Sequence, residues 1–313
     1  MQGKLLGQAV TDSERALEAV LLEISEWPSE HISYAPVLGG ISNTNWQIRI
    51  NGHKIPYFLK MPGQGTEMFI DRQAALEASR RAEEIGIGPK GYPYLAHKGI
   101  EITDFIEDRR SCTNKDFRDV EIRNAAIGAY RQFHNAGQLG LTKTVFDMIE
   151  EHIDQARTLN GFFPQDFDWL YAQYRMARSA LEASGIDLVA CFNDPMPGNF
   201  MVDEAKTIML IDYEYASNND RCYDLGIWCG EMFFSNTIEN EVIEEYFGHF
   251  DPQMYARLYV HKALADIKWS TWAMVQREVS ALDFDFHKYG AWKHMRARSY
   301  MRDPRWKDYL KIV

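Results

Sequence analysis

The sequence predicts a two-lobed α+β protein, in which a small lobe rich in antiparallel strands precedes a larger helical lobe. Residues 32–60 contain short apolar runs separated by turn signals, as hairpin strands do. From about residue 116 onward, apolar residues recur at three- and four-residue spacing, which indicates amphipathic helices. A chain of 313 residues is long enough for two such lobes, and we expect residues 1–106 and 107–313 to form them.

The composition argues against several classes of protein. Acidic residues outnumber basic ones, the net charge is −11, and no sustained run of Lys and Arg suggests nucleic-acid binding. No apolar segment approaches the ~20 residues needed to cross a bilayer, so we expect neither membrane insertion nor secretion. The cysteines form no CxxC pair, which favours reduced thiols in a cytoplasmic protein over a disulfide framework or zinc cluster: Cys112, Cys191, Cys222 and Cys229.

The first lobe is predicted to begin with a helix over residues 11–27, with Thr11 or Asp12 as its N-cap. Three antiparallel strands should follow, with Asn51-Gly52 as a hairpin turn between the second and the third. A further helix and two more strands complete the lobe. The predicted strands span residues 32–38, 45–50, 55–60, 91–95 and 100–106, and the helix spans residues 67–84.

The second lobe is predicted to be mostly helical. Its first helices should span residues 117–136, 145–160 and 167–184, and the last third of the chain, including residues 263–279, also has a helical period. Between these two helical regions lies a stretch rich in Asn, Asp, Pro and Gly, from residue 191 to residue 215.

This stretch contains an acid, an amide and a second acid: Asp194, Asn199 and Asp212. A phosphotransferase site needs a carboxylate that faces the attacking hydroxyl, together with an Asn and an Asp that hold magnesium against the phosphates. Magnesium needs only one or two protein oxygen ligands besides phosphate and water. The alternative is a turn at Asn193-Asp194-Pro195 followed by an ordinary surface acid.

Two features of the first lobe could contact a nucleotide. The Gly39-Gly40 turn could let backbone N–H groups approach phosphates, although on its own this turn favours a plain hairpin. Lys60 ends an apolar strand, where its ammonium could reach phosphate oxygens or simply remain solvated. Glu77, on the predicted helix, could pair with Lys60.

Together these motifs resemble the choline/ethanolamine kinase family, a branch of the protein-kinase-like phosphotransferases that also includes aminoglycoside kinases. The resemblance covers most of the chain and is particularly specific where an Asp-Tyr-Glu-Tyr segment precedes Tyr-Asp-Leu-Gly. The matching motifs are Leu38-Gly39-Gly40-Ile41-Ser42-Asn43, Ile70-Asp71-Arg72, Gly86-Ile87-Gly88-Pro89-Lys90, Thr103-Asp104-Phe105-Ile106, Asn193-Asp194 with Asn199, Ile211-Asp212-Tyr213-Glu214-Tyr215, Tyr223-Asp224-Leu225-Gly226 and Trp269-Ser270-Thr271-Trp272.

The resemblance implies a protein-kinase-like fold, ATP and magnesium as cosubstrates, and transfer of the γ-phosphate to the hydroxyl of choline or ethanolamine. By motif position, Asp194 is similar to the catalytic base, and Asn199 and Asp212 to the magnesium ligands. The residues similar to the nucleotide-binding set are Gly39, Gly40, Ser42, Asn43, Lys60, Thr103, Asp104 and Ile106. A monomer or a homodimer is compatible with the sequence.

The chain departs from the family pattern at three positions. Phe192 replaces the His that usually precedes Asn-Asp, and Pro195 lacks the N–H usual at its position, so the loop must route its backbone bonds differently. The helix Glu expected to pair with Lys60 falls on Ala75. Glu77 lies roughly 200° further round that helix, so either the geometry shifts or Lys60 has another partner.

A quaternary ammonium cannot donate a hydrogen bond, so a choline site needs aromatic faces and nearby negative charge. By family position these are Trp269, Trp272 and Tyr289, with Glu231 as the acid. Core packing of the Trp pair and a surface role for Glu231 are the alternatives. Ethanolamine would instead need hydrogen-bond acceptors, and the two Trp residues favour choline. An aminoglycoside kinase and a catalytically weak choline or nucleotide sensor remain alternative functions.

Overall fold

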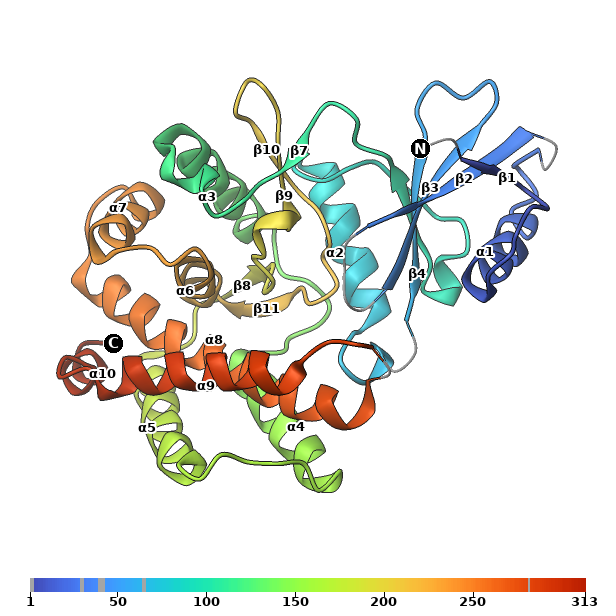
Figure 1. Ribbon diagram of the computed structural model, residues 1–313. Coiled ribbons are helices and arrows are strands. Elements are labelled where there is room, and N and C mark those ends of the chain that lie inside the picture. Colours follow the sequence, from blue (N-terminus) through green and yellow to red (C-terminus); the bar gives the residue numbers. More distant parts are fainter. Residues whose placement is uncertain (1–2, 29–30, 39–42, 64–65, 281) are drawn as a thin grey trace.

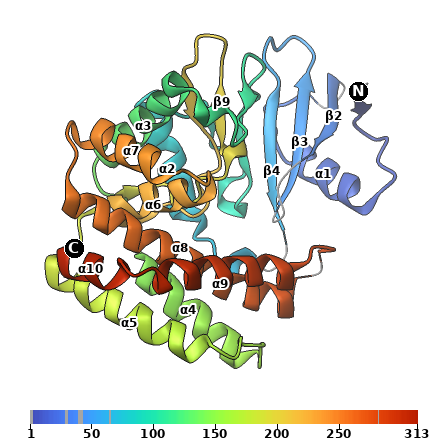
Figure 2. The ribbon, with the colours of Figure 1, turned by 60° about the vertical axis from the view of Figure 1, so that its left-hand side comes forward.

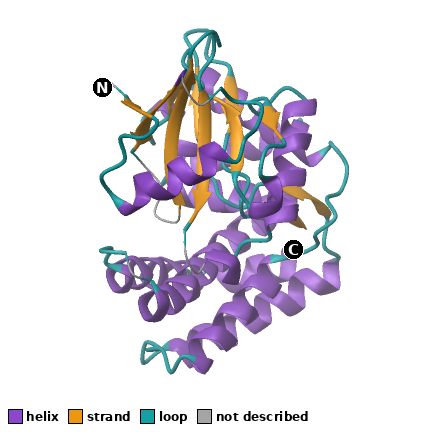
Figure 3. Cartoon of the chain, turned by 90° about the vertical axis from the view of Figure 1, so that its right-hand side faces the viewer, coloured by secondary structure: helices purple, strands orange, loops and turns teal. Residues whose placement is uncertain are grey.

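The computed structural model describes residues 3–28, 31–38, 43–63, 66–280 and 282–313 (Figure 1). Most strands gather at one end of the molecule, and helices make up the other end (Figure 3). This arrangement confirms the predicted α+β organisation, with a β-rich N-terminal part and a helical C-terminal part.

The N-terminal part is built on a six-stranded sheet with the order β1-β2-β3-β4-β6-β5, in which every neighbouring pair is antiparallel. The three predicted hairpin strands are confirmed as β2, β3 and β4. The two-residue edge strand β1 was not predicted. The strands are β1 (Lys4–Leu5), β2 (Ile32–Val37), β3 (Asn43–Ile50), β4 (Tyr57–Pro62), β5 (Gly91–Tyr92) and β6 (Glu101–Asp104).

Two helices flank this sheet (Figure 1). Helix α1 (Asp12–Leu22) begins with a capping box at Thr11, and its buried leucines join the core of the sheet. The predicted helix over residues 67–84 is divided into a 3-10 turn (Thr66–Met68) and α2 (Arg72–Glu84), because the Asp71 side chain caps the backbone N–H groups of Gln73 and Ala74. Alanines of α2 pack into the core shared with the helical part.

Helix α8 is the centre of the helical part, with α9 alongside it and α10 close by (Figure 2). Every residue of α8 from Tyr255 to Val275 is buried, so the helix is enclosed around its whole circumference. The helices are α3 (Val120–His134), α4 (Val145–Thr158), α5 (Phe167–Ser184), α6 (Arg221–Glu231), α7 (Asn236–Phe247), α8 (Pro252–Val279), α9 (Phe286–Arg302) and α10 (Trp306–Ile312). Among the described helices, none combines the length and the apolar character that a membrane span requires.

Two small sheets hold the stretch rich in Asn, Asp, Pro and Gly. Strand β9 pairs with β10 and β7 in one, and β8 pairs with β11 in the other. The 3-10 turn η5 (Pro197–Asn199) leads directly into β9. These short strands fix both ends of the loops that carry the predicted acids. Their bounds are β7 (Arg110–Ser111), β8 (Leu188–Cys191), β9 (Phe200–Val202), β10 (Ile208–Leu210) and β11 (Ser217–Asp220).

Candidate active site

The loop that carries Asp194 is held by a buried carboxylate on α6. Asp224 accepts hydrogen bonds from the backbone N–H groups of Phe192 (2.6 Å) and Asn193 (2.7 Å), and its other neighbour is the His134 ring, 3.1 Å away. Asn193 adopts a left-handed conformation with φ of 63° and donates its side-chain amide to the Tyr215 carbonyl at 2.9 Å. These bonds fix the backbone on the N-terminal side of Asp194.

Asn199 lies directly against Asp194. Its amide nitrogen donates to the Asp194 carbonyl at 3.0 Å and approaches the carboxylate at 3.5 Å. The Met196 N–H also donates to the Asp194 carbonyl, at 2.9 Å, so the loop passes Pro195 without the N–H that proline lacks. Since Asp194 takes up the Asn199 nitrogen, the Asn199 Oδ1 atom is the one suited to a metal.

Asp212 is linked to the same group through the backbone. The Ile211 N–H donates to the Asn199 carbonyl at 3.0 Å, and Asp212 itself has a positive φ of 68° at the end of its apolar strand. The three residues that the sequence singled out therefore meet, although Asp212 is distant from Asp194 in the chain.

Lys60 on β4 faces three carboxylates. Its Nζ atom lies 2.5 Å from Asp212, 3.1 Å from Glu214 and 3.8 Å from Glu101. Burial lowers the pKa of Lys60, but the carboxylates outweigh it and the pKa lies above its usual range. The hypothesis that Glu77 pairs with Lys60 is wrong, because Glu77 instead accepts a hydrogen bond from the Gly140 N–H at 2.9 Å.

A cleft of about 330 Å³ opens beside this group. The six-stranded sheet and the Asn199 and Asp212 loops both line it. The predicted residues found in its lining are Lys60, Thr103, Asp104, Ile106, Asn199 and Asp212. Asn43 lies close by, donating to the Glu214 carboxylate at 2.8 Å. Gly39, Gly40 and Ser42 lie outside the described residues.

The Asp194 carboxyl is buried among other charges. Burial, together with the nearby Asp212 carboxylate, raises its pKa to about 8, and the Lys268 amino group works in the opposite direction. Carboxylate and amide oxygens are the ligands that magnesium prefers. The Asp212 carboxylate and the Asn199 Oδ1 atom therefore fit this ion, at a place where acids outnumber the lysine.

The predicted aromatic residues meet on the other side of the loop. The Trp269 and Trp272 rings are 5.3 Å apart between centroids, and Trp272 and Tyr289 are 5.9 Å apart. The sequence interpretation did not assign Tyr215, whose ring lies 5.3 Å from Trp269, or Phe286, 5.7 Å from Trp272. Tyr215 closes the Asp-Tyr-Glu-Tyr segment, which was the signal available in the sequence.

Glu231 is part of a buried charge network. Lys293 and Arg296 of α9 each approach its carboxylate to 2.5 Å, and Arg296 also binds Asp266. Burial alone would raise the pKa of Glu231, but the two cations outweigh it and the pKa is lowered. Sequence reasoning missed both partners. They lie three residues apart, on one face of a helix that is remote from Glu231 in the chain.

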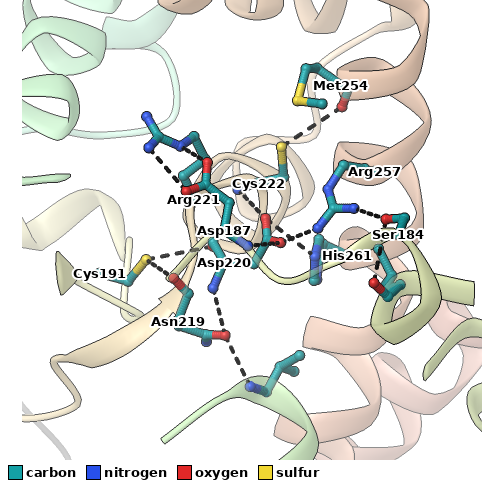
Figure 4. Close-up of polar contacts among 12 residues, drawn as sticks. Ser184, Asp187, Cys191, Asn219, Asp220, Arg221, Cys222, Met254, Arg257 and His261 are labelled. Carbon is teal, nitrogen blue, oxygen red and sulfur yellow. Dashed lines mark hydrogen bonds and ion pairs between the residues drawn. The ribbon is translucent and has the colours of Figure 1, made fainter. Parts of the chain in front are cut away.

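A second buried network supports β11 and the start of α6 (Figure 4). Asp220 caps α6 by accepting the Cys222 N–H at 2.9 Å, pairs with Arg257, and lies 3.6 Å from His261. Burial would raise the pKa of Asp220, but His261 and Arg257 outweigh it and hold the pKa well below its usual range. Arg257 and His261 belong to α8, so the helix that carries the aromatic residues also anchors the loop scaffold.

Comparison with known proteins agrees with this geometry. Residues 34–247 match the pattern of the choline/ethanolamine kinase family. A probable choline kinase 2 of Arabidopsis thaliana is 25% identical, with 88% of each chain covered. The crystal structure of a choline/ethanolamine kinase family protein from Mesorhizobium loti superposes with a TM-score of 0.76 at 25% identity, covering 89% of this chain and 92% of that one.

A crystal structure of LicA in complex with AMP has the same fold, with a TM-score of 0.74 at 21% sequence identity. The match covers 96% of this chain and 100% of the LicA chain. The predicted two-lobed, protein-kinase-like fold is thereby confirmed. With the family pattern matched over more than half its length, the chain belongs to the choline/ethanolamine kinase family.

Proposed function

We propose that this protein transfers the γ-phosphate of ATP to the hydroxyl of choline or ethanolamine, giving phosphocholine or phosphoethanolamine. The observation that carries the proposal is the convergence of Asp194, Asn199, Asp212 and Lys60 beside one cleft. Phosphoryl transfer needs positioning and charge neutralisation more than covalent chemistry, and these four groups are suited to both.

The nucleotide belongs in the cleft between the sheet and the loops. Thr103, Asp104 and Ile106 line it on the sheet side and would surround the base, while Lys60 would contact phosphate oxygens. The AMP bound by LicA supports nucleotide use in this fold. In this arrangement residues 1–106 serve as the nucleotide-binding lobe, and residues 107–313 bind the alcohol.

Asn199 Oδ1 and the Asp212 carboxylate would hold magnesium, which neutralises phosphate charge when bound. Asp194 would accept the proton of the attacking hydroxyl through its carboxylate, which the Asn199 amide keeps in place. The rings of Trp269, Trp272 and Tyr289, with Tyr215, would contact the nitrogen end of the alcohol.

A coupled assay of ADP release tests this proposal. Choline, ethanolamine and kanamycin are offered separately with ATP and magnesium, and Asp194→Asn is the inactive control. We expect turnover with an amino alcohol and none with kanamycin. Turnover with kanamycin alone would indicate an aminoglycoside kinase, and no turnover with any of the three would indicate a sensor.

A further inference from the structure

The amino group of Lys268 lies against two of the clustered aromatic rings, those of Trp269 and Tyr215. Its Nζ atom lies 3.0 Å from the centroid of the Trp269 ring and 4.3 Å from that of Tyr215. The residue is only 1% exposed, and within the described part of the chain its amino group has no hydrogen-bond partner. A buried amino group without a partner is costly, so the site is suited to a ligand that supplies one.

A second lysine, Lys293, contacts another ring of the cluster and the nearby acid. The Lys293 Nζ atom lies 5.2 Å from the centroid of the Tyr289 ring and binds the Glu231 carboxylate. Arg296 holds the same carboxylate. A face of Trp269 and the Glu231 carboxylate, which a quaternary ammonium would require, are thus both engaged by the protein's own basic side chains.

The two candidate alcohols differ in how they can respond. A quaternary ammonium interacts only with aromatic faces and with charge, whereas a primary ammonium also has three N–H donors. Burial lowers the pKa of Lys268 well below its usual range, the Asp194 carboxyl works in the opposite direction, and the net lowering favours the neutral amine. A neutral amine nitrogen can accept a hydrogen bond from a primary ammonium and offers nothing to a quaternary one.

We propose that Lys268 is a specificity-determining residue, and that it selects a primary amino alcohol of the ethanolamine type against a quaternary one. The inference rests on the proposed function, because it concerns the acceptor of that same reaction. It reverses the preference for choline that the two Trp residues alone suggested. Lys268 acts by covering the Trp269 face and by presenting its nitrogen to the substrate.

Lys268→Met tests the inference, since methionine is an unbranched side chain only one heavy atom shorter than lysine and lacks the amino group. The measured quantity is the ratio of kcat/KM for choline to kcat/KM for ethanolamine. We expect the wild type to prefer ethanolamine and the variant to shift the ratio toward choline about tenfold, the size of a cation–π contact regained. Lys288→Met, which removes an exposed lysine beside Tyr289, is the matched control and should not shift the ratio. An unchanged ratio in Lys268→Met would overturn the inference.

A binding measurement separates this inference from the proposed reaction. Tryptophan fluorescence is titrated with tetramethylammonium and with ethylammonium, neither of which can be phosphorylated. We expect the wild type to bind ethylammonium more tightly and Lys268→Met to gain affinity for tetramethylammonium. Tighter binding of tetramethylammonium by the wild type would overturn the role of Lys268, even if ADP release confirms the kinase. The comparison of the two ligands on the wild type remains a test even if the Lys268→Met variant does not fold. A lack of turnover with every alcohol would contradict the proposed reaction. The binding measurement would still test the role of Lys268, because neither ligand is phosphorylated.

Discussion

The cleft beside Asn199 and Asp212 and the cluster of aromatic rings around Trp269 and Trp272 differ in their balance of charge. In the cleft, one lysine faces three carboxylates, so negative charge is in excess. In the aromatic cluster, Glu231 and Asp266 are matched by Lys293 and Arg296, and the Lys268 amino group has no hydrogen-bond partner among the described residues. The cleft is therefore suited to a metal ion with phosphates, whereas the Glu231 and Asp266 carboxylates beside the aromatic rings are already paired with cations. A residue's type alone does not define a binding site, because its partners decide what charge remains.

The largest effect is expected from removing the Asp194 carboxylate. Asp194→Asn should lower kcat about 10³-fold, the usual contribution of a general base, while ATP binding is retained. Steady-state ADP release measures the loss, and nucleotide titration checks the cleft. Asp154→Asn, an exposed acid on α4, is the control. A variant at position 194 with wild-type turnover would contradict the assignment of the base.

A second change tests whether the two regions share one scaffold. Asp220→Asn leaves Arg257 buried without its partner and should lower the free energy of unfolding by about 3 kcal/mol at neutral pH. Because the folded-state pKa of Asp220 is depressed, its stabilisation is present above the unfolded pKa of about 4 and is lost as the pH falls through the lower folded value. Urea unfolding across this range measures the difference from the wild type.

That difference should shrink as the solution is acidified below about pH 4. The control is Asp308→Asn, an exposed acid on α10, which should change stability little at any pH. A gap between wild type and Asp220→Asn that stays constant with pH would show that the carboxylate charge is not what matters.

A third change reduces the aromatic cluster around Trp272 and leaves the cleft intact. Trp272→Phe reduces the ring that contacts Trp269 and Tyr289, so the KM for the amino alcohol should rise about tenfold while that for ATP changes little. Kinetics with each substrate varied in turn provide the measurement. Trp292→Phe, at an exposed position on α9, serves for comparison. Equal effects on both KM values would assign Trp272 to packing alone.

The smallest effect is expected from partly releasing Glu231. Lys293→Met removes one of its two cations, and affinity for tetramethylammonium should improve about threefold because Arg296 still holds the carboxylate. Fluorescence titration gives the affinity, with Lys311→Met as a surface control. Weaker binding in Lys293→Met would mean that this lysine orders the aromatic cluster and does not compete with the ligand.

Local patterns predicted much of the fold. The helix over residues 167–184 was predicted with its observed bounds, because both its apolar spacing and its ends can be inferred from residues close together in the sequence. The short strands β1 and β7 to β11 were not predicted, since segments this short owe their conformation to the strand beside them. The division of the second helix at Asp71 depended on a side-chain cap, which competes with the helical period.

The meeting of Asp194, Asn199 and Asp212 was predictable because Asp194 and Asn199 share one loop and Asp212 follows a nearby apolar run. The partners of Lys60 could not be predicted in the same way. Glu101 faces Lys60 only through the register of β4 and β6, and Glu214 arrives from the other lobe. The position of the Lys268 amino group was also beyond the sequence, because helical spacing assigns a residue to a face without saying which neighbour its tip will reach.

Helix α8 supplies Lys268, Trp269 and Trp272 to the aromatic cluster, and Arg257 and His261 to the buried network that supports β11 and the start of α6. Substrate preference in many enzymes changes when a surface loop is lengthened. A longer loop cannot contact these residues, because α8 is buried around its whole circumference. A change of preferred alcohol in this fold would therefore require substitutions of interior side chains by others of similar volume. These substitutions would have to leave the nearby residues Asp194, Asn199 and Asp212 in place.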